Sequence, residues 1–231
     1  MIKVYMACTD AFRRQELFLQ GCREIDSVRL AKVEACKTAE DKARSLCCGL
    51  LLQYVLRTYE KAAARTEIRY GYGKYGKPYL QDYPALHISL SHSGSYAVLA
   101  LADREGGADV QIIRPLREGV IRRTLSEAEY MIYERLPLAA EKQDWFFRCW
   151  CAKESYVKLT GEGFGREFRA ISLKPGGRRI QPGALCREYC PGAACFLNVC
   201  VYEADGDPGF PQTVTDITQP LCGMVAAGSG R

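Results

Sequence analysis

The sequence predicts an α+β protein built from short strands and long helices. Two observations indicate this class: apolar residues alternate with others in several short segments, and in two longer segments they recur at helical spacing. The 231 residues are enough for one or two compact units but too few for three ordinary domains. Hydrophobic residues make up 48% and charged residues 26% of the chain, a composition that excludes wholesale disorder.

The chain is expected to begin with a strand, followed later by one long helix. Residues 2–8 alternate like a strand, and Asp10 and Arg13 follow too soon for a signal peptide. Residues 38–60 predict a helix, because Thr38 can cap its first turn and leucines recur at helical spacing beyond it.

A pair of strands is expected near the middle of the chain. The turn-rich segment 70–78 precedes the pair, which would span residues 87–92 and 96–101 on either side of a Ser-Gly-Ser turn. The stretch Arg104-Glu105-Gly106-Gly107 then marks a boundary, so the sequence predicts two halves, residues 1–105 and 106–225.

The second half is expected to open with a strand at 108–113. Ser126 and Glu129 have the spacing of a capping box, in which each satisfies a backbone amide at the start of a helix. A longer helix is predicted over 143–159, ending at Gly161. The remaining expected features are strands at 171–173 and 195–202 and a frayed tail at 226–231.

Composition limits the partners. The chain carries 32 Lys and Arg against 27 Asp and Glu, and this mild positive charge suits an acidic partner or a phosphorylated ligand. It is too weak on its own to indicate nucleic-acid binding. No stretch reaches 18 uncharged apolar residues, so no membrane span is predicted.

The twelve cysteines do not have the spacing of a zinc or disulfide framework. Cys47 and Cys48 are adjacent, Cys149 and Cys151 are two apart, and no C-x-x-C occurs. We therefore expect free, mostly buried thiols in a reducing cytoplasm.

Asp109 and Gln111 are candidate cation ligands. They lie two positions apart on an expected strand, so their side chains share one face, and a carboxylate and an amide oxygen together suit magnesium. A pair at a strand end that faces solvent has the same spacing, and spacing alone favours that ordinary alternative.

Three residues of the long helix stack on one face at i, i+4 and i+8: Trp150, Glu154 and Lys158. Trp150 would face the core, which places Glu154 near the boundary of burial. A Glu followed by a Lys four residues later is also typical of a surface ion pair, and the helix alone favours that ordinary alternative.

Two further groups of residues could contact phosphate. Ser91 and His92 lie beside a glycine-containing turn, where hydroxyl and imidazole groups can present donors to an anion. A Ser/His hydrolase is disfavoured because no G-x-S-x-G elbow is present. The scattered basic residues would form a phosphate site only if they converge in space: Arg29, Lys32, Arg44, Lys74 and Lys77.

These pieces together resemble the ordered motifs of the surfactin-type 4′-phosphopantetheinyl transferases. The matching blocks are Gly76-Lys77-Pro78, Ile88-Ser89-Leu90-Ser91-His92-Ser93-Gly94, Ala108-Asp109-Val110-Gln111 and Trp150-Cys151-Ala152-Lys153-Glu154-Ser155-Tyr156-Val157-Lys158. The resemblance covers roughly residues 25–165 and includes Asp41-Lys42-Ala43-Arg44-Ser45-Leu46 upstream.

The resemblance implies a fold and a reaction. The fold would consist of two similar α+β halves in a pseudo-twofold arrangement, with coenzyme A bound in the cleft between them. The enzyme would move the 4′-phosphopantetheine arm of coenzyme A to a serine of an apo acyl or peptidyl carrier protein, releasing adenosine 3′,5′-bisphosphate. Whether that carrier serves fatty-acid, polyketide or peptide synthesis stays open.

The resemblance also implies roles for individual residues. Asp109, Gln111 and Glu154 would bind Mg²⁺, and Asp109, Glu154 and Lys158 would carry catalysis. Glu154 would take the serine proton, and Lys158 would stabilise or protonate the departing phosphate. The residues implied to hold coenzyme A and its phosphates are Arg29, Lys32, Arg44, Lys77, Ser91, His92, Lys153 and Lys158.

Two positions of this chain, Gln111 and Glu129, correspond to glutamates in the family. Many members have Glu where this chain has Gln111, which removes one negative charge, so Gln111 is expected to contact magnesium weakly or through water. Glu129 also matches a family glutamate, but the capping box explains it without catalysis, and we favour that structural role.

Two other functions compete with the transferase. A non-catalytic coenzyme A or nucleotide-binding module would have lost Asp109 or Glu154, and both are present. An RNA-binding protein would interleave aromatic and basic residues, as Tyr72, Lys74 and Tyr75 do faintly. The Gly-Lys-Pro match explains that segment better.

The segment 114–123 is predicted to be a loop. Composition alone slightly favours an ordinary solvated loop, but its place directly after Asp109 and Gln111 and its apolar residues favour docking of the carrier. It carries four Arg against one Glu, and it contains the apolar residues Leu116, Val120 and Ile121. Carrier proteins of this class are acidic helical bundles, so the segment would be complementary in charge. We expect a cytoplasmic monomer with no nucleic-acid or membrane partner.

Overall fold

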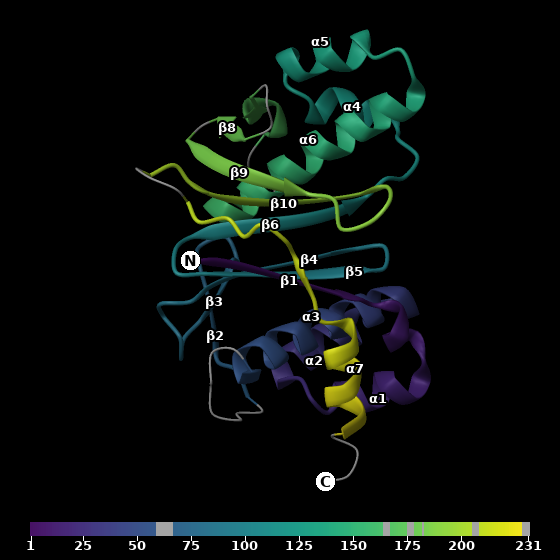
Figure 1. Cartoon of the computed structure of the whole chain (residues 1–231), viewed down its shortest axis with the longest axis vertical. Coiled ribbons are helices and arrows are strands. Elements are labelled where there is room, and N and C mark those ends of the chain that lie inside the picture. Colours follow the sequence, from purple (N-terminus) through teal and green to yellow (C-terminus); the bar gives the residue numbers. More distant parts are fainter. Residues whose placement is uncertain (59–66, 164–166, 175–177, 182, 205–207, 228–231) are drawn as a thin grey trace.

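Two β-sheets form the middle of the molecule, and helices cover the outer side of each (Figure 1). The structure is a computed structural model, and it describes all residues except 59–66, 164–166, 175–177, 182, 205–207 and 228–231. The described helices and sheets confirm the predicted α+β class. The pseudo-twofold relation between the halves stays a prediction.

The first half places α3 against a four-stranded sheet of order β11-β1-β5-β4, in which β11 is Thr215–Asp216, and α1 and α2 pack on α3. Its elements are β1 (Ile2–Cys8), the 3-10 turn η1 (Asp10–Arg13), α1 (Gln15–Cys22), α2 (Ser27–Ala35), α3 (Ala39–Thr58), β2 (Tyr70–Tyr72), β3 (Pro78–Leu80), β4 (His87–Ser93) and β5 (Tyr96–Ala102). Strands β2 and β3 form a separate hairpin.

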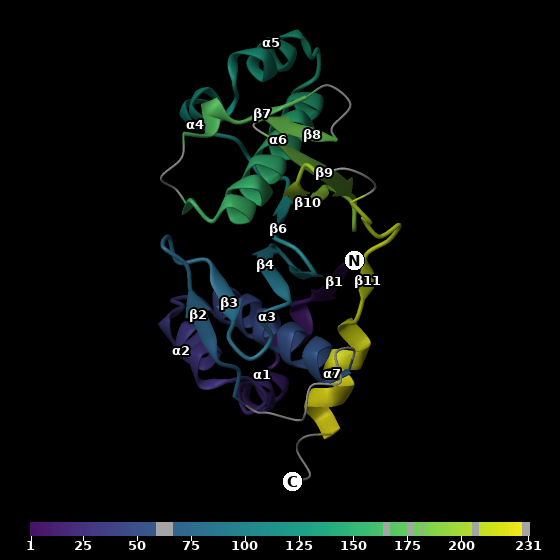
Figure 2. The same ribbon diagram turned by 90° about the vertical axis from the view of Figure 1, so that its left-hand side faces the viewer.

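The second half places α6 on a five-stranded sheet of order β6-β10-β9-β8-β7. Its elements are β6 (Gly106–Ile112), α4 (Glu118–Thr124), α5 (Glu127–Arg135), α6 (Ala139–Thr160), the 3-10 turn η3 (Phe168–Ala170), β7 (Ser172–Leu173), β8 (Arg179–Gln181), β9 (Ala184–Tyr189) and β10 (Cys195–Tyr202). Figure 2 shows α4, α5 and α6 at the opposite end of the molecule from α1, α2 and the C-terminal helix α7 (Thr218–Ala227).

The predicted helices and strands occur close to their expected positions. Thr38 caps α3 by accepting the Asp41 amide at 3.0 Å, and residues 59–60 of that prediction lie outside the described residues. Helix α6 begins four residues earlier than expected and ends at Gly161, whose φ of +71° is the left-handed conformation that glycine adopts without strain.

The segment 114–123 differs from its prediction as a loop. Residues 118–124 form helix α4, which buries Ile121 in the core of the second half. The apolar spacing of Val120, Ile121 and Thr124 suits a short amphipathic turn, and the surrounding arginines obscure it in the sequence.

The C-terminal segment packs on the first half. The sequence prediction instead assigned it, with the rest of residues 106–225, to the second half. Strand β11 (Thr215–Asp216) pairs with β1 in parallel, and α7 (Thr218–Ala227) follows it. Ile217, Leu221 and Val225 are buried in the core beneath α1 and α3. The frayed tail predicted from residue 226 is wrong for residues 226 and 227, which complete α7; residues 228–231 lie outside the described part.

The edge strands β4 and β6 join the two halves. Each belongs to a different sheet, and hydroxyls on β4 accept amides of β6: Ser89 from Ala108 at 2.8 Å, Ser91 from Val110 at 3.2 Å, and Ser93 from Ile112 at 3.2 Å. Because an edge strand otherwise leaves its amides unpaired, this ladder fixes the register of one half against the other.

The cysteines and the hydropathy of the helices bear on two further predictions. All twelve cysteines are free, and seven of them are buried, as expected. Among the described residues, no helix is both long enough and apolar enough to cross a membrane.

Candidate active site

Three elements bring the predicted site residues together. Strand β6 carries Asp109 and Gln111, helix α6 carries Glu154 and Lys158, and strand β4 carries Ser91. These elements pack against one another, so residues far apart in sequence become neighbours.

Gly107 allows α6 to lie directly on β6. A Cβ atom at this position would be 2.0 Å from the carbonyl oxygen of Ser155 and 2.3 Å from the amide nitrogen of Leu159. Any larger residue would push the helix away from the strand. The sequence prediction treated this glycine only as part of a boundary, although an isolated Gly in a strand pattern signals a close backbone approach.

Asp109 is the centre of the site. Its residue is 2% exposed, and both of its carboxylate oxygens are engaged. Oδ1 accepts the Ser91 hydroxyl at 2.6 Å and pairs with the Lys158 ammonium at 2.6 Å. Oδ2 accepts the Gln111 amide nitrogen at 2.8 Å. The solvent-facing alternative for Asp109 is therefore wrong.

Glu154 lies half-buried one helical turn before Lys158. Burial, and then the negative charge of Asp109, raise the pKa of Glu154 to about 7, while Lys158 opposes the shift. The two carboxylates are therefore close enough to interact, and Glu154 can exchange a proton near neutral pH.

A group of cations surrounds His92. The pKa of His92 is lowered, first because the neighbouring protein removes water from its ring. The positive charges of Arg44, Lys158 and Arg29 add to this shift. The Arg44 guanidinium group is held by Asp41 at 2.5 Å and reaches the Gly94 carbonyl at 3.4 Å. An anion placed among these groups would relieve their mutual repulsion.

Arg29 and Lys32 extend this basic region along α2. Arg29 donates to the Ser45 carbonyl at 3.1 Å, and its buried Nε has no partner among the described residues. Partial burial and the charge of Arg29 lower the pKa of Lys32. The Lys32 ammonium also lies 5.5 Å from the centre of the Tyr72 ring.

Lys77 bridges the halves. Its ammonium donates to the Leu159 carbonyl at 2.9 Å and the Gly106 carbonyl at 3.3 Å, and it pairs with Glu105. Lys77 therefore caps the C-terminal end of α6, and a phosphate would have to compete with these acceptors.

The structure places Lys153 away from the site. It is completely buried and pairs with Glu129, and its ammonium donates to the carbonyls of Thr124 at 2.6 Å and Phe168 at 3.1 Å. We therefore remove Lys153 from the expected phosphate ligands, because its contacts hold the core of the second half together. Glu129 closes the predicted capping box with Ser126 and also accepts the Leu173 amide at 2.8 Å, which confirms its structural role.

The residues around Asp109 have the chemistry of a magnesium site that is completed by its substrate. No group of three or more His, Cys, Asp or Glu side chains that could hold a metal occurs in the described part of the chain. Magnesium is usually held by one or two carboxylates together with substrate phosphates, so Asp109, Glu154 and the Gln111 amide fit this mode of binding.

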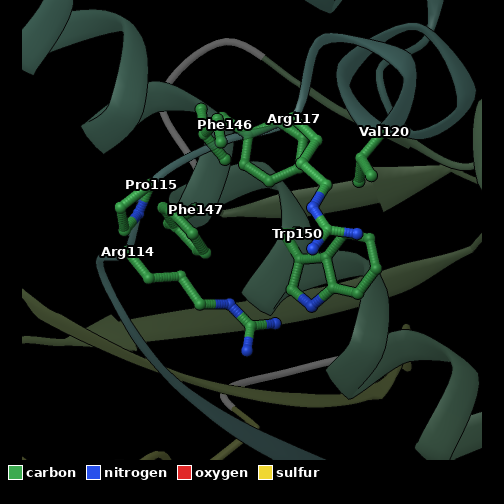
Figure 3. A pocket seen from close by; sticks show the side chains of 8 residues that line it. Arg114, Pro115, Arg117, Val120, Phe146, Phe147 and Trp150 are labelled. Atoms are coloured by element: carbon green, nitrogen blue, oxygen red, sulfur yellow. The ribbon is translucent and has the colours of Figure 1, made fainter.

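A pocket of about 340 Å³ lies beside the site. Its lining residues are Arg114, Pro115, Leu116, Arg117, Val120, Phe146, Phe147 and Trp150. Figure 3 shows the Arg114 and Arg117 guanidinium groups reaching toward the side on which Trp150 lies. Trp150 is one helical turn before Glu154, so the pocket adjoins the candidate site along α6.

Known proteins resemble this chain along most of its length. The family model described as the 4′-phosphopantetheinyl transferase superfamily matches residues 106–194. The Bacillus subtilis 4′-phosphopantetheinyl transferase Sfp is 28% identical, over 94% of this chain and 98% of its own. The Nostoc 4′-phosphopantetheinyl transferase HetI is 31% identical, over 62% and 65% of the two chains. Among solved structures, Thermotoga maritima holo-[acyl-carrier-protein] synthase aligns with 47% of this chain and 72% of its own, at 18% identity and a TM-score of 0.37.

Proposed function

We propose that this chain, whose membership of the 4′-phosphopantetheinyl transferases these relatives confirm, transfers the phosphopantetheine arm of coenzyme A to a serine of a carrier protein. The observation that carries the proposal is the convergence of Asp109 on β6 with Glu154 and Lys158 on α6. Two acids and a lysine at one point suit transfer of a phosphorylated group from a diphosphate to a hydroxyl.

The basic side of the first half would hold coenzyme A. Arg29, Lys32, Arg44 and His92 influence one another electrostatically, and they carry several donors. A polyphosphate bound there would replace repulsion between cations with charge-assisted hydrogen bonds. His92 suits this role because its lowered pKa favours the neutral ring, which has one N–H group that can donate a hydrogen bond and one nitrogen that can accept one.

Asp109, Glu154 and Gln111 are the residues that would hold Mg²⁺. A bound magnesium ion would screen the negative charge of the pyrophosphate. The amide nitrogen of Gln111 is used by Asp109, so the amide oxygen is the atom that Gln111 could offer to a cation.

The proton of the carrier serine would pass to the Glu154 carboxylate. A pKa of about 7 makes that carboxylate a suitable base at neutral pH. The serine oxygen would then form a bond to the β-phosphorus, as the bond from that phosphorus to the departing nucleotide phosphate breaks. The Lys158 ammonium lies on the same helical face and would stabilise the oxygen that leaves.

The carrier would dock at the pocket beside Trp150. Arg114 and Arg117 are exposed there, and apolar side chains line the remaining wall. Arg122 and Arg123, which the sequence prediction included, have other contacts: Arg122 stacks on the Tyr130 ring at 3.8 Å, and Arg123 donates to the Gly119 carbonyl. An acidic helical carrier therefore meets Arg114 and Arg117 first.

Two broader proposals follow from the fold. One chain supplies β4 from the first half and β6 and α6 from the second, so a monomer would contain a whole site. Twelve free thiols suit a reducing compartment, which supports a cytoplasmic location.

The test is an intact-mass assay. The protein is incubated with Mg²⁺, coenzyme A and a panel of apo carrier proteins from fatty-acid, polyketide and peptide synthesis. At least one carrier should gain the mass of one phosphopantetheine, and its serine-to-alanine variant should gain none. A protein that binds coenzyme A but modifies no carrier would instead be the non-catalytic binding module.

A further inference from the structure

Lys158 and a metal ion have to compete for Asp109. The Lys158 ammonium lies 2.6 Å from Oδ1 of Asp109, and the Ser91 hydroxyl donates to the same oxygen. The other carboxylate oxygen accepts the Gln111 amide nitrogen. Three donors from the chain itself therefore engage both oxygens of the carboxylate.

The charges within the site also disfavour a metal ion on its own. Asp109 and Glu154 each contribute one negative charge when ionised, Lys158 contributes one positive charge, and Gln111 contributes none. The net charge is then −1. A doubly charged hard cation needs a stronger negative field than this.

The Lys158 ammonium is free to leave Asp109 when a phosphate binds nearby. Its side chain is 29% exposed, its second contact is a long one to the Leu90 carbonyl at 3.4 Å, and its electrostatic influence reaches His92 among the phosphate-binding cations. Lysine is a point charge on a flexible stem, so its ammonium can move without a backbone change.

We propose that Lys158 couples the two binding events: it pairs with Asp109 until a pyrophosphate takes over its ammonium, and Asp109 Oδ1 is then released to the metal. The proposal rests on the proposed function, because the pyrophosphate is that of coenzyme A. Coupling of this kind is reciprocal, so the metal must also strengthen coenzyme A binding through Lys158.

The test measures binding of Mn²⁺ by electron paramagnetic resonance, without coenzyme A or carrier. Wild type is compared with Lys158→Met and with Arg148→Met, which removes one positive charge from the same helix at its ion pair with Glu188. We expect Lys158→Met to tighten Mn²⁺ binding roughly tenfold or more, the value of a charge-assisted contact, and Arg148→Met to leave it unchanged.

Three results would overturn the proposal. Lys158→Met binds Mn²⁺ no more tightly than wild type; both variants tighten it equally; or the gain disappears in 0.5 M KCl, as a long-range charge effect would. A further comparison concerns coupling: coenzyme A should tighten Mn²⁺ binding by a smaller factor in Lys158→Met than in wild type, and an equal factor would contradict the proposal.

A measurement on unaltered protein guards against a misfolded variant. Acetylation of lysines is followed by peptide mass mapping with and without Mg²⁺ at saturating concentration. Release from Asp109 should speed acetylation of Lys158, while the half-buried Lys142 on the same helix should not change; an unchanged rate at Lys158 would overturn the proposal. None of these readouts needs transfer activity, so their failure is distinguishable from failure of the proposed function.

Discussion

At the scale of single residues, the environment of Asp109 could be predicted only in part. Its spacing to Gln111 predicts a shared strand face, but that pattern alone favours a solvent-exposed pair. In the structure Asp109 is buried and holds three side-chain donors from β4, β6 and α6. Only the tertiary arrangement supplies two of those donors, so strand periodicity could not identify them.

Ser91 is the residue whose expected role changes most. The sequence prediction assigned it to phosphate, whereas its hydroxyl donates to Asp109 and accepts the Val110 amide. We expect Ser91→Ala to slow transfer at least tenfold while leaving the coenzyme A dissociation constant nearly unchanged. The control is Ser93→Ala, which removes a rung of the same ladder without touching Asp109. Titration calorimetry and the mass assay check both; a large loss of coenzyme A affinity in Ser91→Ala would restore the phosphate role.

Glu154 should make stability depend on pH. Its pKa is raised from an ordinary 4.5 to about 7, so the folded protein holds this proton more tightly than the unfolded chain, and stability falls as pH rises across that interval. Glu154→Gln cannot ionise and avoids the loss. We expect its Tm to exceed that of wild type by more at pH 8 than at pH 5. The exposed Glu141→Gln on the same helix should show no such trend; an equal Tm difference at both pH values for Glu154→Gln contradicts the assignment.

At the scale of elements, apolar periodicity and capping residues were enough to predict the long helices. The same signals were too weak to predict the short helices. The Thr38 and Ser126 caps and the Gly161 stop lie where predicted. Helices α1 and α2, with eight and nine residues, were not predicted. Short helices take most of their stability from tertiary packing, so local sequence carries little of the information.

Lys153 shows how helix geometry could have corrected a motif-based assignment. Adjacent helical residues point about 100° apart, so Lys153 cannot share the face of Glu154, whereas Lys158 does. The resemblance carried the whole motif over without this geometric test. Helix α6 therefore has two functions, with one face toward the site and another toward α4, α5 and η3.

Loss of the Lys153 ammonium should destabilise the fold. Lys153→Met leaves the buried carboxylate of Glu129 without its countercharge, and breaking a buried pair costs about 3–5 kcal/mol. The control Lys142→Met lies half-buried on the same helix and loses only the contact of its ammonium with the Tyr133 ring, so stability should change by less than about 1 kcal/mol. Urea denaturation measures both. A Lys153→Met protein of wild-type stability with weakened coenzyme A binding would show that the phosphate role was right after all.

At the scale of the whole molecule, two halves meet along β4 and β6, and the chain end returns to the first half. The strand pair β1–β11 involves two residues of β11, too few to show as a pattern in the sequence. The contact between β4 and β6 was not predicted either. In it, serine hydroxyls of β4 accept the β6 amides that the backbone carbonyls of a paired strand would otherwise accept. The glycines and charges at 104–107 lie at the junction of β5 and β6, which belong to different sheets, but they do not predict that β11 returns to the first sheet.

Carrier docking is a property of the assembled surface. Arg117 lines the pocket beside Trp150, whereas Arg123 donates to a carbonyl of its own helix. We expect Arg117→Glu to raise the KM for carrier several-fold with little change in the KM for coenzyme A, because a like charge then faces an acidic partner. Arg123→Glu makes the same charge change and should have a smaller effect. Wild-type transfer at low carrier concentration should also slow with added salt. Equal effects of both variants, or no dependence on salt, would place carrier docking elsewhere.

The central claim is that the contact between β6 and α6 at Asp109 is the catalytic centre. The most direct test is the single-turnover rate of phosphopantetheine transfer for Asp109→Asn, measured by intact mass of the carrier at saturating Mg²⁺ and coenzyme A. The matched control is Asp144→Asn, an exposed position on α6. We predict a loss of at least a hundredfold for an Asp109→Asn protein that circular dichroism shows to be folded at the assay temperature, and a wild-type rate for Asp144→Asn. A folded Asp109→Asn protein that transfers at a near-wild-type rate would contradict the account.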